Sequence, residues 1–363
     1  MHQLNLIPSI DNPAMRLRNR INAQFFPPRL DQNLIRHVLA EEFGLTGEIH
    51  QLSGEREQNF LLQQDGEDRY VVKVFRHSDA PGTIEFQTRA LQHLKTQLPQ
   101  MSVPDVRKTL SGEAIHLHKG AGLEVFEIRV LEYLEGQPVA DGVSPSTRLA
   151  ANAGFLVGTV TRQLGRFQHD NAVEFMPWDV SNRLLGDPAF WSLGGADIRK
   201  YEDRLRQGYV EILPVLLRQR AHIIYNDAHL ENILRRSGDA DDASGLIDFG
   251  DILHAPIACD VATLALGFAE NADAPAALAA AAVSGYHSAY PLLSQEFDMI
   301  YDLMIARQAL SVLLFDTKLA DPRLHSHDLE RTRASLMDRL DTLLDMDRTQ
   351  FNSAVRDTCG MGE

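Results

Sequence analysis

The stretch IIYNDAHLENIL, residues 223–234, places an aspartate, a histidine and an asparagine between two apolar runs. Burying a polar group without a partner costs roughly 2–7 kcal/mol, so such a cluster needs a reason. A second apolar run nearby ends in the same way, in GLIDFGD at 245–251. The two runs predict short strands joined by a turn, which would bring Asp248 close to Asn232.

Asp227, Asn232 and Asp248 together form an acid, an amide and a second acid at predicted strand ends. Hard oxygen ligands of this kind suit Mg²⁺ that carries phosphates. In phosphoryl transfer, one aspartate accepts or orients the proton of the acceptor hydroxyl, while the amide and the second acid hold metal. The alternative is that Asp227 caps a turn and Asp248 ends a strand. In context, the set predicts a kinase.

A lysine in the N-terminal part supplies a candidate phosphate ligand. Lys73 lies in the middle of the apolar strand YVVKVF, 70–75. Buried strand lysines are uncommon without a partner, and a nucleotide phosphate is one such partner. Glu85, on the helix predicted at 83–98, could pair with Lys73, and Gln87 is the less favoured candidate for that role. Surface charge is the alternative interpretation of Glu85.

Two further segments complete a nucleotide site. The loop within LSGEREQNFLL, 52–62, contains Ser53 and Gly54, whose backbone N–H groups could approach phosphate. The segment VLEYLEG, 130–136, closes the N-terminal part where a purine base would hydrogen-bond to backbone.

The order of elements predicts an α+β fold with two lobes. Residues 27–134 predict helix, three strands, helix and two strands, which is a nucleotide-binding lobe of antiparallel sheet. Its first helix should be capped by Asp31 and end at Gly44. Residues 135–139 then predict a hinge, and 140–347 a mostly helical lobe with the catalytic loop and substrate pocket. We expect 1–26 to be a loosely docked arm and 348–363 a tail.

Bulk composition excludes several classes of protein. The 363 residues carry a formal net charge of −15, which argues against a nucleic-acid partner. No apolar run reaches the roughly 18 residues that a membrane span needs, and the N-terminus lacks the apolar core of a signal peptide. Cys259 and Cys359 are the only cysteines, so a disulfide framework is not expected. We therefore expect a cytoplasmic protein without a membrane partner.

YNDAHLENIL at 225–234 and GLIDFGDILHAPIACDVA at 245–262 resemble the catalytic and metal segments of the aminoglycoside phosphotransferase and choline kinase superfamily. LSGEREQNFLL, YVVKVF and IEFQTRALQHL are similar to the hydroxylysine kinase-like branch of that family. The resemblance covers roughly residues 27–340. It implies a bilobal protein-kinase-like fold with Mg²⁺ and with ATP or GTP as co-substrate.

Residue by residue, the resemblance implies a role for each matching position. Asp227 would be the catalytic base, and Asn232 and Asp248 the Mg²⁺ ligands. Lys73 would bind the nucleotide phosphates, oriented by Glu85. The base pocket would be lined by the backbone of Glu132, Tyr133 and Leu134. Asp260 matches a family aspartate with a structural role.

The chain departs from the family at one position. The family usually has histidine two residues before the catalytic aspartate, and Tyr225 stands there in this chain. That residue braces the loop, so the departure bears on loop geometry rather than on chemistry.

The predicted function is transfer of the γ-phosphoryl of ATP or GTP to a hydroxyl of an amino alcohol or hydroxy amino acid. A substrate bearing an amine would suit the acid-rich helical lobe. Two alternatives are an antibiotic kinase acting on aminoglycosides or macrolides, and a nucleotide-binding pseudoenzyme that serves as a partner module. A zinc site at His222, His229 and His254 is a weaker hypothesis because their spacing matches no ligand pattern. The sequence indicates neither the individual substrate, nor the nucleotide, nor the oligomeric state.

Overall fold

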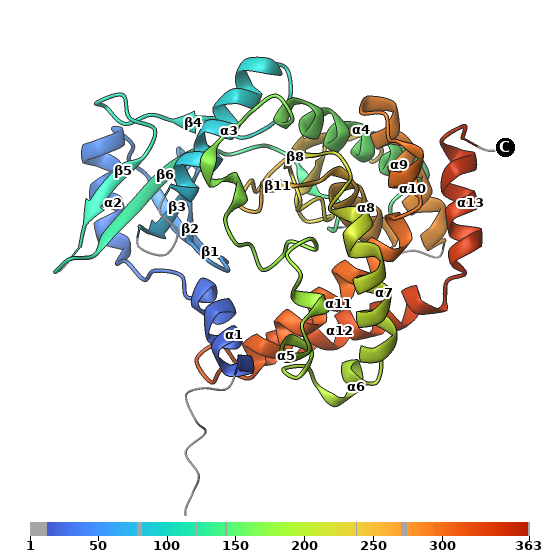
Figure 1. The fold of residues 1–363 in the computed structure, drawn as a ribbon. Helices are drawn as coiled ribbons and strands as arrows, with labels where there is room; N and C mark the ends of the chain where they lie inside the picture. The colour runs from blue at the N-terminus through green and yellow to red at the C-terminus, as the bar shows by residue number, and fades with distance from the viewer. Residues whose placement is uncertain are drawn as a thin grey trace, which may run out of the picture.

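The computed structural model describes residues 13–77, 82–120, 122–141, 144–236, 238–269 and 274–361. A lobe built on a sheet lies beside a larger lobe built mainly of helices (Figure 1). The predicted α+β class is therefore confirmed. Residues 1–12 of the predicted arm, 142–143 of the predicted helical lobe and 362–363 of the predicted tail lie outside the described residues.

The smaller lobe is an antiparallel sheet with two helices. Its strands follow the order β1-β2-β3-β6-β4, and β5 also pairs with β6. The strands are β1 (Glu48–Leu52), β2 (Gln58–Gln64), β3 (Glu67–Arg76), β4 (Val106–Arg107), β5 (His116–Lys119) and β6 (Val125–Glu132). The helices are α2 (Gln32–Phe43) and α3 (Thr83–Gln97). The short strand β4 is the one element here that the pattern did not predict.

The first helix of this lobe has the predicted ends. Asp31 accepts a hydrogen bond from the Asn33 N–H at 2.8 Å, and Gly44 adopts a φ of +65°. A left-handed residue just past the last turn suits glycine, because it has no Cβ to clash. Ile35 and Phe43 of α2 are buried in the core that the helix forms with the sheet.

The larger lobe contains most of the helices. Its main helices are α4 (Thr147–Leu164), α7 (Glu202–Leu216), α8 (Ile257–Ala269), α9 (Pro275–Ala289), α11 (Ile300–Leu319) and α12 (His327–Asp345). Shorter helical pieces are η2 (Asp170–Val173), η3 (Leu184–Gly186), α5 (Pro188–Trp191), α6 (Ala196–Arg199) and α10 (Ser294–Phe297). All thirteen residues of α8 are buried, so α8 forms the centre of this lobe.

Short strands of the larger lobe flank the predicted catalytic loop. They are β7 (Gln137–Pro138), β8 (Ala221–Ile224), β9 (Ile233–Arg235), β10 (Ala243–Leu246) and β11 (Leu253–Pro256). The predicted hairpin is β9–β10, joined at its edge by β7, and β8 pairs instead with β11. The Ile247 N–H donates to the Asn232 carbonyl at 3.0 Å, which brings the two polar ends together as expected.

Both predicted terminal segments differ from expectation. Residues 13–25 form α1 (Pro13–Asn22) and η1 (Ala23–Phe25), and Ile21 and Phe25 are buried in the core of the larger lobe. Asn22 anchors this segment by donating to the Thr317 carbonyl at 2.9 Å. The predicted tail contains α13 (Arg348–Thr358), which buries Phe351 and Val355. Short amphipathic helices give a weak periodic signal, and their docking is fixed by tertiary packing.

Two helices behind the catalytic loop approach unusually closely. A Cβ built on Gly154 of α4 would lie 1.9 Å from the Ala282 carbonyl oxygen of α9. A Cβ on Gly285 of α9 would lie 1.9 Å from the Ala151 carbonyl oxygen of α4. Only glycine fits at these two positions, which together form a glycine seam between the helices.

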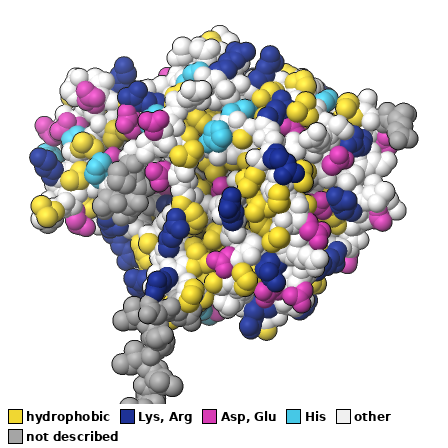
Figure 2. All heavy atoms as spheres, in the orientation of Figure 1, with side chains coloured by type: hydrophobic (Ala, Val, Ile, Leu, Met, Phe, Trp, Pro, Cys, Tyr) yellow, Lys and Arg dark blue, Asp and Glu magenta, His cyan; other side chains and the backbone are white. Residues whose placement is uncertain are grey.

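No helix within the described residues is long and apolar enough to cross a membrane. The face drawn in Figure 2 shows acidic and basic side chains interspersed around a central group of apolar ones.

Candidate active site

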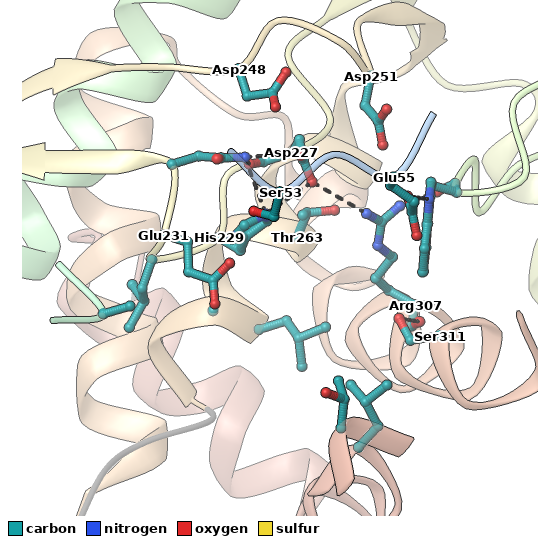
Figure 3. A pocket seen from close by; sticks show the side chains of 18 of the residues that line it. Ser53, Glu55, Asp227, His229, Glu231, Asp248, Asp251, Thr263, Arg307 and Ser311 are labelled. Atoms are coloured by element: carbon teal, nitrogen blue, oxygen red, sulfur yellow. Dashed lines mark hydrogen bonds and ion pairs between the residues drawn. The ribbon is translucent and has the colours of Figure 1, made fainter. Parts of the chain in front are cut away.

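A cavity of about 910 Å³ lies between the two lobes. The β1–β2 loop lines one side of it, and the catalytic loop lines another with Asp227, His229 and Asn232. Helices α8, α11 and α12 complete the wall, with Thr263, Arg307 and Leu336 among the lining residues. Figure 3 shows acidic, basic and hydroxyl side chains from these elements directed into one space.

Asp227 and Asn232 are joined directly. Nδ2 of Asn232 donates to Oδ2 of Asp227 at 2.8 Å and to the Asp227 carbonyl at 3.1 Å. Because the amide nitrogen faces Asp227, the amide oxygen of Asn232 is left for another ligand. Asp227 and Asn232, which are five residues apart in the sequence, therefore form a single polar unit.

The backbone beside this unit is held in an unfavourable conformation. Asn226 has a φ of +64° and Asp248 a φ of +51°, a region that costs free energy for residues other than glycine. The Asn226 N–H donates to Oδ1 of buried Asp260 at 2.7 Å. Asp260 in turn accepts hydrogen bonds from Thr161 at 2.6 Å and Tyr286 at 3.2 Å. Asp260 thus positions the catalytic loop.

Tyr225 braces the same loop from its other side. Its hydroxyl donates to the Ile247 carbonyl, one residue before Asp248, and its ring packs edge-on against Phe249 at 5.1 Å. Tyr225 is fully buried. The tyrosine therefore ties the segment before Asp227 to the segment before Asp248.

Basic groups surround the carboxylate of Asp227. Nε2 of His229 lies 3.5 Å from Oδ1 of Asp227, and Nη2 of Arg307 lies 3.8 Å from the same atom. Burial acts to raise the pKa of Asp227, but these cations outweigh it and the pKa is lowered. Burial likewise acts to lower the pKa of His229, and Asp227 overrides it and raises that pKa to about 9. Asp227 is therefore ionised at neutral pH, as a proton acceptor must be.

Lys73 reaches Asp248 across the gap between the lobes. Nζ of Lys73 lies 3.1 Å from Oδ1 of Asp248 and 2.8 Å from Oε1 of Glu57. Burial acts to raise the pKa of Asp248, yet the charge and hydrogen bond of Lys73 lower it to about 2. The pKa of Lys73 is raised, because Asp248 and Glu57 outweigh the opposing effect of burial. The structure thus brings Lys73 beside Asp248, as the predicted site requires.

The predicted pairing of Glu85 with Lys73 is wrong. Glu85 is half-exposed and pairs with Arg89 at 2.6 Å, one turn along α3. The inward side chain of this helix is Gln87, which donates to the Gly250 carbonyl at 2.8 Å and accepts from buried Arg129 at 3.3 Å. Helical periodicity alone did not decide whether Glu85 or Gln87 faces the core. The way the helix packs on the sheet places Gln87 on the buried side. The carboxylate beside Lys73 comes from Glu57 instead.

The loop between β1 and β2, which contains Ser53 and Gly54, reaches the larger lobe. A Cβ on Gly54 would lie 2.1 Å from the Glu57 carbonyl oxygen, so the tight turn requires glycine. Both Ser53 and Gly54 line the cavity.

The tip of this loop is held by a clamp of two ion pairs. Arg56 pairs with Asp251 and also donates to the Gly250 carbonyl at 3.1 Å. Glu55 pairs with Lys318 of α11 and accepts from Nε1 of Trp178 at 3.1 Å. Burial raises the pKa of Asp251 to about 7, with Arg56 opposing the shift.

Two backbone N–H groups of the predicted base-binding segment already donate hydrogen bonds to other parts of the protein. The Glu132 N–H donates to the Asp105 carbonyl and the Tyr133 N–H to the Arg69 carbonyl, both at 2.9 Å. These two N–H groups are therefore committed to the protein. Glu132, Tyr133 and Leu134 do not line the cavity of 910 Å³.

The donor set at the strand ends fits a hard cation. Asp248 is ionised at neutral pH and uses Oδ1 for Lys73 and the Gly250 N–H, at 3.1 and 3.0 Å. Its second oxygen and the amide oxygen of Asn232 are of the kind that Mg²⁺ prefers. By contrast, the described ranges contain no group of three or more His, Cys, Asp or Glu that could hold a metal. The alternative zinc site gains no support there.

Several site residues were not predicted from the sequence. They are Glu57, Arg56, Asp251, Arg129, Trp178, Arg307 and Lys318. Glu57 lies inside the predicted loop, and Asp251 ends the quoted GLIDFGD. Arg307 and Lys318 lie in a mostly apolar helix at 300–319 that also contains Asp302 and Asp316, and charges inside such a run are a signal that could have identified them.

Comparisons with known proteins found a family model and several relatives that match this chain. The model of the phosphotransferase enzyme family matches residues 48–294. A hydroxylysine kinase of Danio rerio is 24% identical over 302 residues, which cover 79% of this chain and 84% of that protein.

Two solved structures share the fold, each with a TM-score of 0.66. An amicoumacin kinase in complex with AMP-PNP and Ca²⁺ is 15% identical and covers 93% of this chain and 99% of its own. A microcompartment-associated aminopropanol kinase is 18% identical, and the match covers 92% of this chain and 99% of that kinase.

Proposed function

Because the chain belongs to the phosphotransferase enzyme family, we propose that it transfers the γ-phosphoryl of ATP or GTP to a hydroxyl of an amine-bearing metabolite. The class is a small-molecule kinase with an alcohol group as acceptor. The acceptor proposed is an amino alcohol or a hydroxy amino acid, similar to hydroxylysine.

One observation carries this proposal. Asn232 bonds to Asp227, Lys73 pairs with Asp248, and Asp227, Asn232 and Asp248 line the same cavity. In the reaction, the acceptor oxygen would form a bond to the γ-phosphorus. The bond between the γ-phosphorus and the oxygen that bridges it to the β-phosphate would break. The nucleoside diphosphate leaves with that oxygen. Asp227 would accept the proton of the hydroxyl, since its carboxylate is ionised and lines the cavity.

The nucleotide would be bound from the smaller lobe. Lys73 would contact its phosphates, with the loop at Ser53 and Gly54 approaching them through backbone N–H groups. The base would lie at 132–134, where the carbonyl groups and the Leu134 N–H are the candidates for its hydrogen bonds.

A divalent cation would be held by Asn232 and Asp248. Mg²⁺ at these residues would neutralise charge on the phosphates. Lys73 beside Asp248 adds a fixed positive charge to the same place.

The nature of the acceptor rests on the relatives and on the cavity. Relatives with similar sequence or fold carry the names hydroxylysine kinase and aminopropanol kinase, and both names describe acceptors with an amine. Glu231 lines the cavity, and its carboxylate would face an ammonium group of the acceptor.

The test is phosphate transfer from ATP and from GTP, with Mg²⁺, to a panel of acceptors. The panel contains hydroxylysine, homoserine, ethanolamine, choline, sugars and two aminoglycosides. Transfer to one amine-bearing acceptor is expected, and Asp227→Asn should abolish it while nucleotide affinity stays close to wild type. Full activity of Asp227→Asn would exclude the assignment. Nucleotide binding without transfer to any acceptor would favour the pseudoenzyme.

A further inference from the structure

Arg307 places a buried guanidinium at the acceptor end of the cavity. It lies on α11, and its side chain is only 8% exposed although it lines the cavity. Its Nη2 is 3.8 Å from Oδ1 of Asp227, and Figure 3 shows the guanidinium directed toward Asp227 from α11. A group bound to Arg307 would therefore lie close to a hydroxyl that contacts Asp227.

Most donors of this guanidinium are left for a ligand. Its Nη1 donates to the Trp178 carbonyl and its Nη2 lies 3.8 Å from Asp227, while its charge also acts to lower the pKa values of Asp179 and Asp251. A guanidinium carries five N–H donors, so several are available. The plane is also fixed, because the guanidinium carbon lies 5.4 Å from the centre of the Trp178 ring. Such a group is pre-organised to bind an anion.

Neutralising Asp227 does not explain Arg307. His229 approaches the same Asp227 oxygen more closely, at 3.5 Å, and Asn232 donates to the other oxygen at 2.8 Å. The carboxylate of Asp227 is thus already compensated by its own loop. A buried arginine carries a desolvation cost, which a well-placed anion would help to offset.

The charge of Arg307 discriminates between the two proposed acceptor classes. An amino alcohol brings only an ammonium group, which Arg307 repels, and an aminoglycoside brings several. A hydroxy amino acid also brings a carboxylate, which a guanidinium binds through two parallel hydrogen bonds. In Figure 3, Glu231 lies on the side of the cavity away from Arg307, and its charge acts to raise the pKa of His229.

We propose that Arg307 binds the carboxylate of the acceptor while Glu231 faces its ammonium, so that the acceptor is a hydroxy amino acid. This inference rests on the proposed function and narrows it. Arg307 then determines specificity by contact with the acceptor.

The test uses pairs of acceptors that differ only by the carboxylate. The pairs are homoserine and 3-amino-1-propanol, threonine and 1-amino-2-propanol, serine and ethanolamine, and 5-hydroxylysine and 1,5-diamino-2-pentanol. The kcat/KM of each member is measured with wild type, Arg307→Gln and Arg307→Lys. Arg331→Gln, which removes an exposed charge on α12 outside the cavity, is the matched control.

The wild type should prefer the amino acid of at least one pair. Arg307→Gln should lower that preference about 10- to 100-fold, mainly through KM, because a charge-assisted bidentate contact is lost. Arg307→Lys keeps the positive charge but cannot make the two parallel hydrogen bonds, so it should retain part of the preference for the amino acid. Arg331→Gln should leave the preference unchanged. The ratio within a pair cancels any effect that Arg307 exerts through Asp227.

Three outcomes would overturn the inference. The wild type could use the decarboxylated member as well as the amino acid, or Arg307→Gln could lower kcat for both members equally, which would indicate an effect through Asp227. In both cases the kinase assignment survives. Absence of transfer to every member, with both nucleotides, would instead remove the proposed function and this inference with it.

Discussion

Oε1 of Glu57 lies 2.8 Å from Nζ of Lys73, so a carboxylate of the β1–β2 loop contacts the cation proposed for the nucleotide phosphates. Carboxylate and phosphate oxygens seek the same ammonium. A phosphate that binds Lys73 therefore has to compete with Glu57. The loop proposed to cover the phosphates also carries a competitor for their binding site.

Removing this competitor should strengthen nucleotide binding. Glu57→Gln keeps the size of the side chain but removes its charge, so we expect the Kd for ATP to fall about 3- to 10-fold, which is about 1 kcal/mol. Equilibrium titration of the protein with ATP, with Mg²⁺ present, measures the change. Glu85→Gln is the matched control, because Glu85 pairs with Arg89 at the surface. A large effect of Glu85→Gln and none of Glu57→Gln would contradict the observed pairing.

The pair between Glu55 and Lys318 should hold the tip of the loop. Nζ of Lys318 lies 4.0 Å from the ring centre of Phe25 and 4.6 Å from that of Phe315, so its position is well defined. Glu55→Gln or Lys318→Met should each speed amide exchange in residues 53–57, measured by mass spectrometry. The double variant should be no faster than the single ones, because both remove one interaction. Glu67→Gln, in a surface pair with Arg69, should leave that exchange unchanged.

Asp260 should make stability depend on pH in the acid range. Burial raises the pKa of this carboxyl to about 6, above its ordinary value of 3.8. Between these two values the folded protein holds a proton that the unfolded chain has lost. The free energy of unfolding therefore falls as pH rises from about 4 to 6, by on the order of 3 kcal/mol, and Asp260 contributes no slope above 6.

Asp260→Asn should remove that contribution, because an amide does not titrate. Urea unfolding at several values between pH 4 and pH 8 measures the slope for both proteins. Identical slopes in wild type and variant would mean that the carboxyl of Asp260 is ionised throughout this range.

Tyr225→Phe should weaken the brace between the two catalytic segments. It removes the hydroxyl that donates to the Ile247 carbonyl, so we expect the free energy of unfolding to fall by about 1 kcal/mol. We also expect kcat to fall, since Ile247 precedes Asp248. Tyr290→Phe is a control: its hydroxyl bonds to His222 at 3.0 Å, away from the cavity, and only stability should respond. Unchanged kcat in Tyr225→Phe would show that the brace does not position Asp248.

The sequence predicted those helices and strands that are determined by neighbouring residues. The capped helix from Asp31 to Gly44 and the hairpin that joins Asn232 to Asp248 are confirmed, because capping and strand alternation are written in consecutive residues. The partner of Lys73 could not be predicted in this way. Whether Glu85 or Gln87 turns inward depends on how α3 docks on the sheet, and the sheet register is fixed by contacts distant in sequence.

The acceptor side of the cavity shows the same limit. Arg307 lies 80 residues beyond Asp227. The sequence of its helix indicates that the helix is buried, but not which residues of the chain it faces. The 13–25 segment was predicted to be loosely docked, yet Phe25 packs beside Lys318 of the same helix. Both relationships arise from tertiary packing, for which the single sequence carries no periodic signal.

The glycine seam between α4 and α9 has a consequence for inherited variation. Thr161 and Tyr286, which flank this seam, both bond to Asp260, and Asp260 holds the backbone beside Asp227. A single methyl group at Gly285 would force the two helices apart and loosen that support. Such a substitution would lower activity in the same way as a change within the active site, although neither glycine lines the cavity. Loss of activity at this position should therefore be interpreted as a change of architecture, and sequences that diverge from this one are expected to change both helices together.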